Sequence, residues 1–127
     1  MRLINCTTLK FEEVVGRELP PYAILSHTWG KYEITFKDYV EGDGLRTRLG
    51  SDKILKTCEI ALQAGYPYVW IDTCCIDKSS SAELTEAINS MFNYYKRAER
   101  CIVYLSDFDS EDPNADFSQC RWFARGW

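Results

Sequence analysis

The sequence predicts a single α/β domain with a central parallel sheet. Three short apolar runs, at residues 22–29, 68–72 and 100–105, are separated by two segments whose apolar residues recur at helical spacing. Strands that alternate with helices are typical of a parallel sheet with right-handed crossovers. Runs this apolar suit strands that are covered on both faces. A length of 127 residues fits one domain with its own core.

The first fifty residues are expected to form strands and a loop. Residues 3–15 alternate weakly between apolar and polar side chains, which indicates a strand or a hairpin before the main sheet. A pair of prolines then interrupts the chain, and the first parallel strand ends at Gly30. The segment from there to Gly50 contains several glycines and charges, so we expect it to be a loop.

Two helices are predicted by their end signals and apolar spacing. The first begins at Ser51 and stops at Gly65. The second opens with a capping box of Ser80 and Glu83. Its expected apolar stripe consists of Leu84, Ile88, Met91, Phe92 and Tyr95. An acidic loop follows the third strand, and residues 119–127 predict the start of another helix.

Composition excludes several classes of protein. The net charge of −4 and the pI near 5.0 give no basic footprint for nucleic acid. The N-terminus lacks the apolar region of a signal peptide, and no run is long enough to span a bilayer, so we expect a cytoplasmic protein with no membrane partner. Six cysteines without a C-x-x-C pair, beside one histidine, predict no metal site. Cys58 and Cys101 are expected to be buried free thiols.

Polar side chains gather where the predicted strands end. In an open sheet of parallel strands, ligands bind at the carboxyl ends of the strands. The residues at these ends are Ser26, His27, Trp29 and Gly30 on the first strand, Asp72 and Cys74 on the second, and Ser106 and Asp107 on the third. The chain has no Gly-rich dinucleotide fingerprint, no P-loop and no G-x-S-x-G elbow, so a nucleotide would have to bind in another way.

Three segments resemble the fungal heterokaryon incompatibility (HET) domain. They are Tyr-Ala-Ile-Leu-Ser-His-Thr-Trp-Gly at 22–30, Trp-Ile-Asp-Thr-Cys-Cys-Ile-Asp-Lys at 70–78 and Cys-Ile-Val-Tyr-Leu at 101–105. Between the first two, Lys53-Ile near Cys58 also matches. The helical segment 79–92 continues the likeness, which covers essentially the whole chain. The resemblance implies a TIR-like, flavodoxin-like three-layer fold with a mostly parallel sheet. It also implies an effector domain in non-self recognition and regulated cell death.

The resemblance leaves two activities open. Some TIR domains cleave NAD at the nicotinamide–ribose bond with a glutamate on the helix after the third or fourth strand. In the HET family that glutamate would lie beyond Trp127, where the family usually reads Thr-Leu-Gln-Glu-Leu. We therefore expect residues 1–127 to be one HET domain that is incomplete at its C-terminus. NAD would be a substrate and not a bound cofactor. The alternative is a non-catalytic module that assembles with itself or with other signalling domains.

Each candidate residue has a functional and a structural interpretation. His27 and Asp72 are the catalytic candidates, with His27 as a base or ribose contact and Asp72 as a carboxylate for ribose or proton transfer. Both could equally satisfy backbone groups. Ser26 precedes His27 in a strand, so their side chains point to opposite faces. Trp29 stacks on a nucleotide ring or simply packs.

The remaining candidates lie farther along the chain. Cys74 is a thiol nucleophile with His27 as its base, or a buried inert cysteine. Asp77 binds ligand or anchors the turn before the second helix. Arg121 and Arg125 flank Trp122 and either clamp a phosphate or form surface salt bridges.

Overall fold

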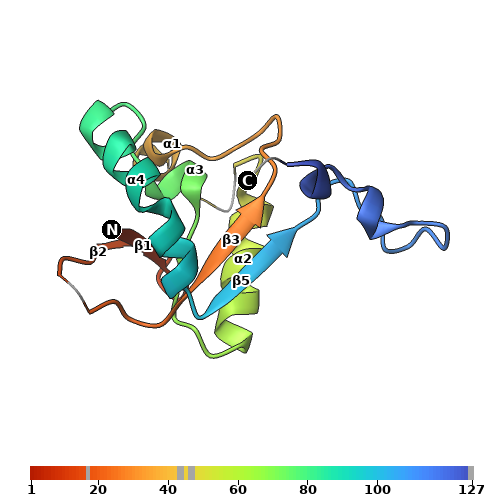
Figure 1. The fold of residues 1–127 in the computed structure, drawn as a ribbon, viewed down its shortest axis with the longest axis horizontal. Coiled ribbons are helices and arrows are strands. Elements are labelled where there is room, and N and C mark those ends of the chain that lie inside the picture. Colours follow the sequence, from red (N-terminus) through yellow and green to blue (C-terminus); the bar gives the residue numbers. More distant parts are fainter. Residues whose placement is uncertain (17, 43–44, 46–47, 126–127) are drawn as a thin grey trace.

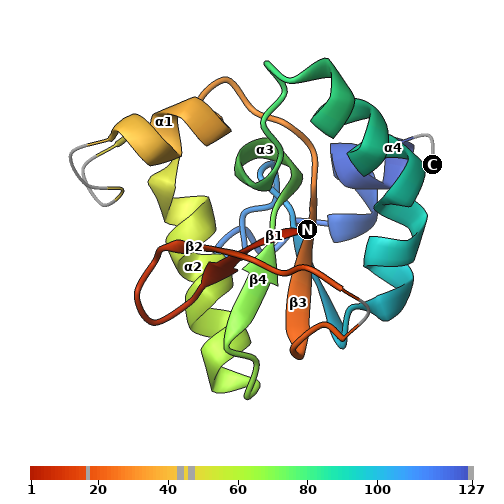
Figure 2. The same cartoon turned by 90° about the vertical axis from the view of Figure 1, so that its left-hand side faces the viewer.

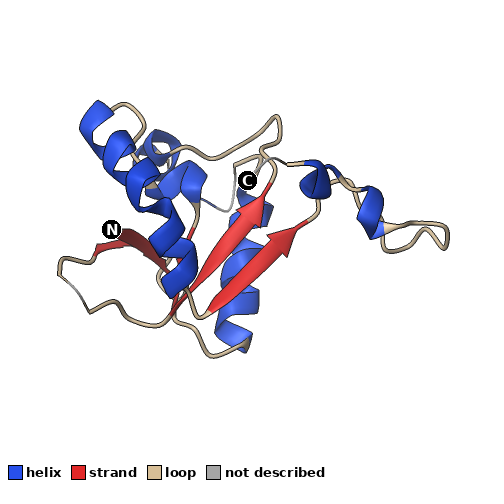
Figure 3. Ribbon diagram, in the orientation of Figure 1, coloured by secondary structure: helices blue, strands red, loops and turns tan. Residues whose placement is uncertain are grey.

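The computed structural model describes residues 1–16, 18–42, 45 and 48–125. Its centre is a five-stranded mixed sheet in the order β2-β1-β4-β3-β5. Figure 3 shows the strands between helices, and Figures 1 and 2 together give their labels. The strands are β1 (Arg2–Asn5), β2 (Phe11–Glu13), β3 (Tyr22–His27), β4 (Tyr68–Trp70) and β5 (Arg100–Tyr104).

The predicted α/β class and the N-terminal hairpin are confirmed, but the sheet is mixed. Strand β3 pairs in parallel with β4 on one side and β5 on the other. The hairpin of β1 and β2 is antiparallel, and β1 also pairs antiparallel with β4. Leu3 and Ile4 of β1 are completely buried. The apolar side chains of β1 therefore join the main core, and the hairpin becomes part of the sheet.

The two long helices cover opposite faces of the sheet (Figures 1 and 2). Since β4 and β5 lie on opposite sides of β3, two crossovers of the same hand must place their helices on opposite faces. Each crossover also contains a short helix. The helices are α1 (Phe36–Glu41), α2 (Ser51–Gln63), α3 (Asp72–Cys75) and α4 (Ser81–Arg97).

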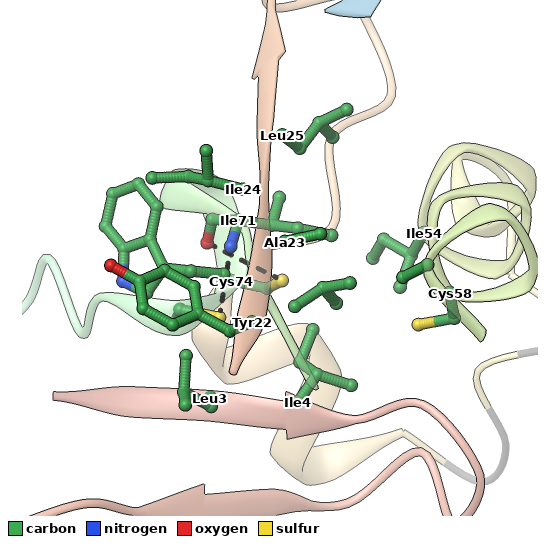
Figure 4. Packing of buried hydrophobic residues seen from close by; sticks show 14 of the residues in the cluster. Leu3, Ile4, Tyr22, Ala23, Ile24, Leu25, Ile54, Cys58, Ile71 and Cys74 are labelled. Atoms are coloured by element: carbon green, nitrogen blue, oxygen red, sulfur yellow. Dashed lines mark hydrogen bonds between the residues drawn. The ribbon is translucent and has the colours of Figure 1, made fainter. Parts of the chain in front are cut away.

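Strand β3 supplies the middle of the core, and all six of its residues are buried. Ala23 and Leu25 point toward Ile54 and Cys58 of α2 (Figure 4). Side chains alternate along a strand, so the next residue of β3, Ser26, points to the α4 face and His27 to the α2 face. This alternation decides which helix each functional side chain of β3 can reach.

On the other face, aromatic side chains join α4 to the sheet. The ring of Trp70 lies 5.4 Å from the ring of Tyr94 and 6.3 Å from the ring of Tyr95, measured between centroids. The Tyr22 hydroxyl donates a hydrogen bond to the carbonyl of Tyr94. These contacts hold α4 over β3 and β4.

The predicted start of α4 is confirmed, with one difference. Ser80 is the N-cap, and its hydroxyl accepts from the backbone N–H of Glu83 at 3.3 Å. The carboxylate of Glu83 does not complete a capping box. It accepts instead from the backbone N–H of Asp77 at 3.0 Å and from the Arg2 guanidinium at 2.6 Å. Glu83 thus ties the start of α4 to β1.

Three expectations about exposure and local structure were wrong. The expected loop before Gly50 contains α1, which is capped by Thr35. Ile88 and Phe92 are 61% and 77% exposed, because α4 lies over β3 and β4 and turns this part of its stripe outward. Cys58 is buried as expected, but Cys101 is exposed because β5 is the edge strand of the sheet.

The C-terminal segment contains two short 3-10 helices, Phe117–Gln119 and Arg121–Ala124. The start of another helix was predicted over residues 119–127, of which 126–127 lie outside the described residues. The segment runs out from the end of β5 and returns toward the end of β3 (Figure 1). In the part of the chain that the structure describes, no helix is long and apolar enough to cross a membrane.

Candidate functional site

The imidazole of His27 lies at the end of β3, between a carboxylate and an ammonium group. Its Nε2 is 2.8 Å from Oδ1 of Asp72, and its Nδ1 is 3.0 Å from Nζ of Lys53. The parallel register pairs Ile24 with Trp70, so the ends of β3 and β4 lie side by side. That register brings His27 and Asp72 together, as the strand-end rule predicted for these two residues.

Asp72 begins α3 directly after β4 and is held as a carboxylate. Trp29 donates its indole N–H to Oδ2 of Asp72 at 3.0 Å, beside the His27 contact at Oδ1. Burial raises the pKa of Asp72, but the hydrogen bond from His27, with contributions from Trp29 and Lys78, outweighs it and leaves the pKa below its usual value. With 17% of its side chain exposed, Asp72 can still meet a ligand.

Lys53 and Glu33 complete the site, and the sequence reasoning missed both as site residues. Nζ of Lys53 lies 2.5 Å from Oε1 of Glu33, and the same oxygen accepts from the backbone N–H of Gly30 at 2.6 Å. The sequence offers one signal for Lys53, since Lys53-Ile near Cys58 is part of the resemblance to the HET domain. On α2, Lys53 precedes buried Ile54 and lies one turn before buried Thr57, whose hydroxyl donates to the carbonyl of Lys53 at 2.7 Å.

Trp29 and Lys78 form the outer part of the site. Trp29 is 52% exposed, and the ammonium of Lys78 lies 4.7 Å from the centroid of its ring. Lys78 also donates to the backbone carbonyl of Asp72 at 2.7 Å. Burial lowers the pKa of Lys78 and outweighs the opposite effect of Asp72. An aromatic ring, a carboxylate and a cation therefore lie within one small region.

The C-terminal candidates lie beside the paired ends of β3 and β5. Trp122 donates its indole N–H to Oγ of Ser26 at 3.0 Å, and Arg125 donates to the backbone carbonyl of His27. The structure thus brings Ser26, Trp122 and Arg125 close to His27, with Ser26 on the opposite face of the strand. The hydrogen bonds from Trp122 and Arg125 hold the C-terminal segment against the end of β3.

Asp107 and Arg121 form a separate pair after β5. Oδ2 of Asp107 accepts from the backbone N–H of Arg121 at 2.9 Å, and the side chain of Arg121 donates to Ser106 at 3.1 Å. The backbone hydrogen bond from Arg121 is the main cause that lowers the pKa of Asp107. This pair ties the C-terminal segment to the end of the sheet.

Cys74 and Asp77 are not part of the group around His27. Cys74 is completely buried, and its sulfur lies 4.0 Å from the carbonyl oxygen of Ile71. Burial, followed by Cys75, raises the pKa of the Cys74 thiol, which opposes formation of a nucleophilic thiolate. Asp77 accepts from the backbone N–H and the hydroxyl of Ser79, at 3.0 and 2.6 Å, and so shapes the turn before α4.

Comparison with known proteins gives the family. Residues 22–124 match the family model for heterokaryon incompatibility protein (HET). The chain belongs to the HET family. It is 47% identical to vegetative incompatibility protein HET-E-1 of Podospora anserina, over 91% of this chain and 9% of that protein's length. No solved structure matches. Except for Arg125, the residues described around His27 lie inside the part that matches the HET family.

The lowered pKa of Asp72 predicts acid sensitivity in this HET chain. A carboxyl with a depressed pKa stabilises the fold fully above its unfolded pKa, near 3.8, and loses this effect as the pH falls through the folded pKa. Asp72→Asn is therefore expected to lower the free energy of unfolding at pH 6, and the gap from wild type should narrow below about pH 4. Urea unfolding at a series of pH values measures both. A gap that stays constant down to pH 3 would contradict the prediction.

Proposed function

We propose that this chain is an effector module of fungal heterokaryon incompatibility, acting in non-self recognition and regulated cell death, and that it hydrolyses NAD. Its membership of the HET family supports the biological role. The relative HET-E-1 is a vegetative incompatibility protein. The hydrolytic activity is supported by the chemistry of the site.

A TIR-like, flavodoxin-like, three-layer relationship is part of this proposal. The three parallel strands lie in the order β4-β3-β5, so β3, which comes first in the sequence, is in the middle. Flavodoxin-like sheets have the same local strand order. The long helices cover opposite faces (Figure 2). In such folds ligands bind outside the carboxyl ends of the strands, where His27 and Asp72 lie.

The observation that carries the proposal is the juxtaposition of Asp72, Trp29 and Lys78. The carboxylate of Asp72 can accept hydrogen bonds from ribose hydroxyls, as acidic residues do in nucleotide sites. The half-exposed indole of Trp29 offers a surface for a base or nicotinamide ring. The ammonium of Lys78 can pair with a phosphate. Together these groups match the ring, sugar and phosphate of a nucleotide.

A pocket of about 450 Å³ adjoins this group and has the volume of a small-molecule site. Thr73, Asp77 and Lys78 line one side, and Phe36 and Lys37 of α1 line another. Lys78 belongs to both the pocket and the Trp29 contact. A nucleotide bound at Trp29 could therefore extend its phosphates past Lys78 into this pocket.

In the proposed reaction, the bond between nicotinamide N1 and ribose C1′ breaks and its electron pair stays on the ring nitrogen. The oxygen of a water molecule bonds to C1′, and its proton leaves to solvent, which gives nicotinamide and ADP-ribose. Positive charge develops on the ribose as the bond breaks. The carboxylate of Asp72 holds the ribose hydroxyls. In this proposal it also stabilises the developing charge, the role that the resemblance to TIR domains gives to a glutamate and that carboxylates have in glycoside hydrolysis.

Nicotinamide release from NAD by the purified chain tests this function. Asp72→Ala is expected to reduce release by at least about 100-fold, since positioned acid–base groups contribute that much or more. Glu59→Gln, on the exposed surface of α2, should leave the rate within about twofold. Unchanged release by Asp72→Ala, or no release by folded wild-type protein over a range of concentrations, would overturn the proposal.

A non-catalytic assembly module is the second candidate, and one observation favours it. Ile88 and Phe92 lie one turn apart on α4 and are largely exposed, and Val103 of edge strand β5 is 43% exposed. Exposed apolar groups of this kind mark interaction surfaces when they are contiguous. Two results together would favour the assembly module. The folded chain would release no nicotinamide, and its sedimentation mass would rise with protein concentration. Phe92→Ser should abolish that rise in mass.

A further inference from the structure

We propose that Lys53, held by Glu33, is a positioning residue of the site. It fixes His27 in the tautomer that carries its hydrogen on Nε2 and directs that hydrogen at Asp72. This inference rests on the proposed function for its catalytic meaning. Its geometric content concerns only the chain's own side chains.

The contacts at the two ring nitrogens of His27 require the same tautomer. The Lys53 ammonium has three donor hydrogens and no acceptor, so Nδ1 of His27, 3.0 Å from Nζ, must accept. The Asp72 carboxylate has acceptors only, so Nε2, 2.8 Å from Oδ1, must donate. The hydrogen therefore lies on Nε2.

Glu33 explains why Lys53 stays beside the imidazole. Only 11% of the Lys53 side chain and 14% of the Glu33 side chain are exposed, and their charged atoms are 2.5 Å apart. The Glu33 carboxylate also accepts from the backbone N–H of Gly30, so it is itself anchored. A largely buried ammonium with this partner cannot turn away to solvent without breaking its ion pair with Glu33.

These contacts give His27 and Asp72 different roles. Both ring nitrogens of His27 are engaged, and only 1% of its side chain is exposed. His27 therefore holds Asp72 and does not itself meet substrate. Asp72 accepts from His27 and Trp29 through different oxygens, which fixes the plane of its carboxylate. Lys53 acts on the ligand-facing carboxylate through the imidazole.

Nitrogen-15 NMR of His27 tests this assignment without any substrate. The chain has one histidine, so the two ring-nitrogen resonances are assigned without ambiguity. At pH 8 the wild-type protein is expected to show the tautomer with hydrogen on Nε2. Finding the hydrogen on Nδ1 of the folded wild-type protein would overturn the proposal directly, with no variant needed.

Two variants isolate Lys53 from Asp72. In Asp72→Ala only Lys53 directs the tautomer, so the resonances should remain those of a single form with hydrogen on Nε2. Adding Lys53→Met removes the donor and leaves Oε1 of Glu33, 3.9 Å from Nδ1, as an acceptor on that side of the ring. Hydrogen should then leave Nε2 in part or entirely, and both ring-nitrogen resonances should shift away from their values in Asp72→Ala. Identical ring-nitrogen shifts in the two folded variants would show that Lys53 does not determine the tautomer of His27.

Kinetics separate this inference from the proposed function. If the chain releases nicotinamide, Lys53→Met should lower kcat by at least about tenfold with a smaller change in KM, because it disturbs an orienting group. Lys53→Gln, which keeps an N–H donor, should retain more activity than Lys53→Met. If the folded wild-type chain releases none, the proposed function fails and the NMR result still decides the role of Lys53.

Discussion

Replacing Trp70 with alanine is expected to lower the free energy of unfolding by about 3–5 kcal/mol, the range for a large aromatic side chain removed from a core. Trp70 is 1% exposed, and its ring contacts those of Tyr94 and Tyr95. Its removal leaves a cavity between β4 and α4 that rigid aromatic neighbours cannot fill. Urea unfolding followed by circular dichroism measures the change.

Phe92→Ala is the matched control for this substitution. Phe92 is an aromatic residue on the same helix but is 77% exposed, so the expected change is within about 0.5 kcal/mol. A loss for Trp70→Ala no larger than that for Phe92→Ala would mean that α4 is not packed on the sheet through Trp70. The pair also tests the orientation of α4, since the sequence pattern placed Phe92 on its apolar stripe.

The fold was predictable where local sequence patterns agree with the final tertiary structure. Apolar runs identified the strands, and the Ser80 cap identified the start of α4. Helix α1 was missed because glycines around it suggested a loop, although Thr35 and Asp38 form a reciprocal cap. The pairing of β1 with β4 depends on contacts between residues more than sixty positions apart, and no local pattern contains that information.

The site was predictable only as far as strand ends determine it. His27 and Asp72 follow adjacent parallel strands, so topology alone brings them together. Lys53 and Glu33 come from a helix and a loop, and their approach to His27 depends on how α2 docks against the sheet. Glu33 lies in the long segment between Gly30 and Ser51, whose own sequence pattern gave little information.

At Gly50, the docking of α2 leaves no room for a Cβ atom. It is the N-cap of α2 with φ of +88°, and a Cβ there would lie 2.0 Å from the carbonyl oxygen of Tyr32. Gly50→Ala is expected to destabilise the protein by about 2–5 kcal/mol. The left-handed backbone accounts for about 1–2 kcal/mol of this, and overpacking against backbone accounts for about 1–3 kcal/mol. Urea unfolding measures the total.

Gly65→Ala separates the two contributions. Gly65 has the same φ of +88°, but a Cβ there would meet nothing within 4 Å, so only the backbone term of about 1–2 kcal/mol should appear. Equal losses at the two positions would show that contact with Tyr32 is unimportant. The contact matters for the site because Tyr32 precedes Glu33, and Gly50 precedes the helix that carries Lys53. A glycine lets these two backbones approach closely, and the close approach brings the Lys53 ammonium to both Glu33 and His27.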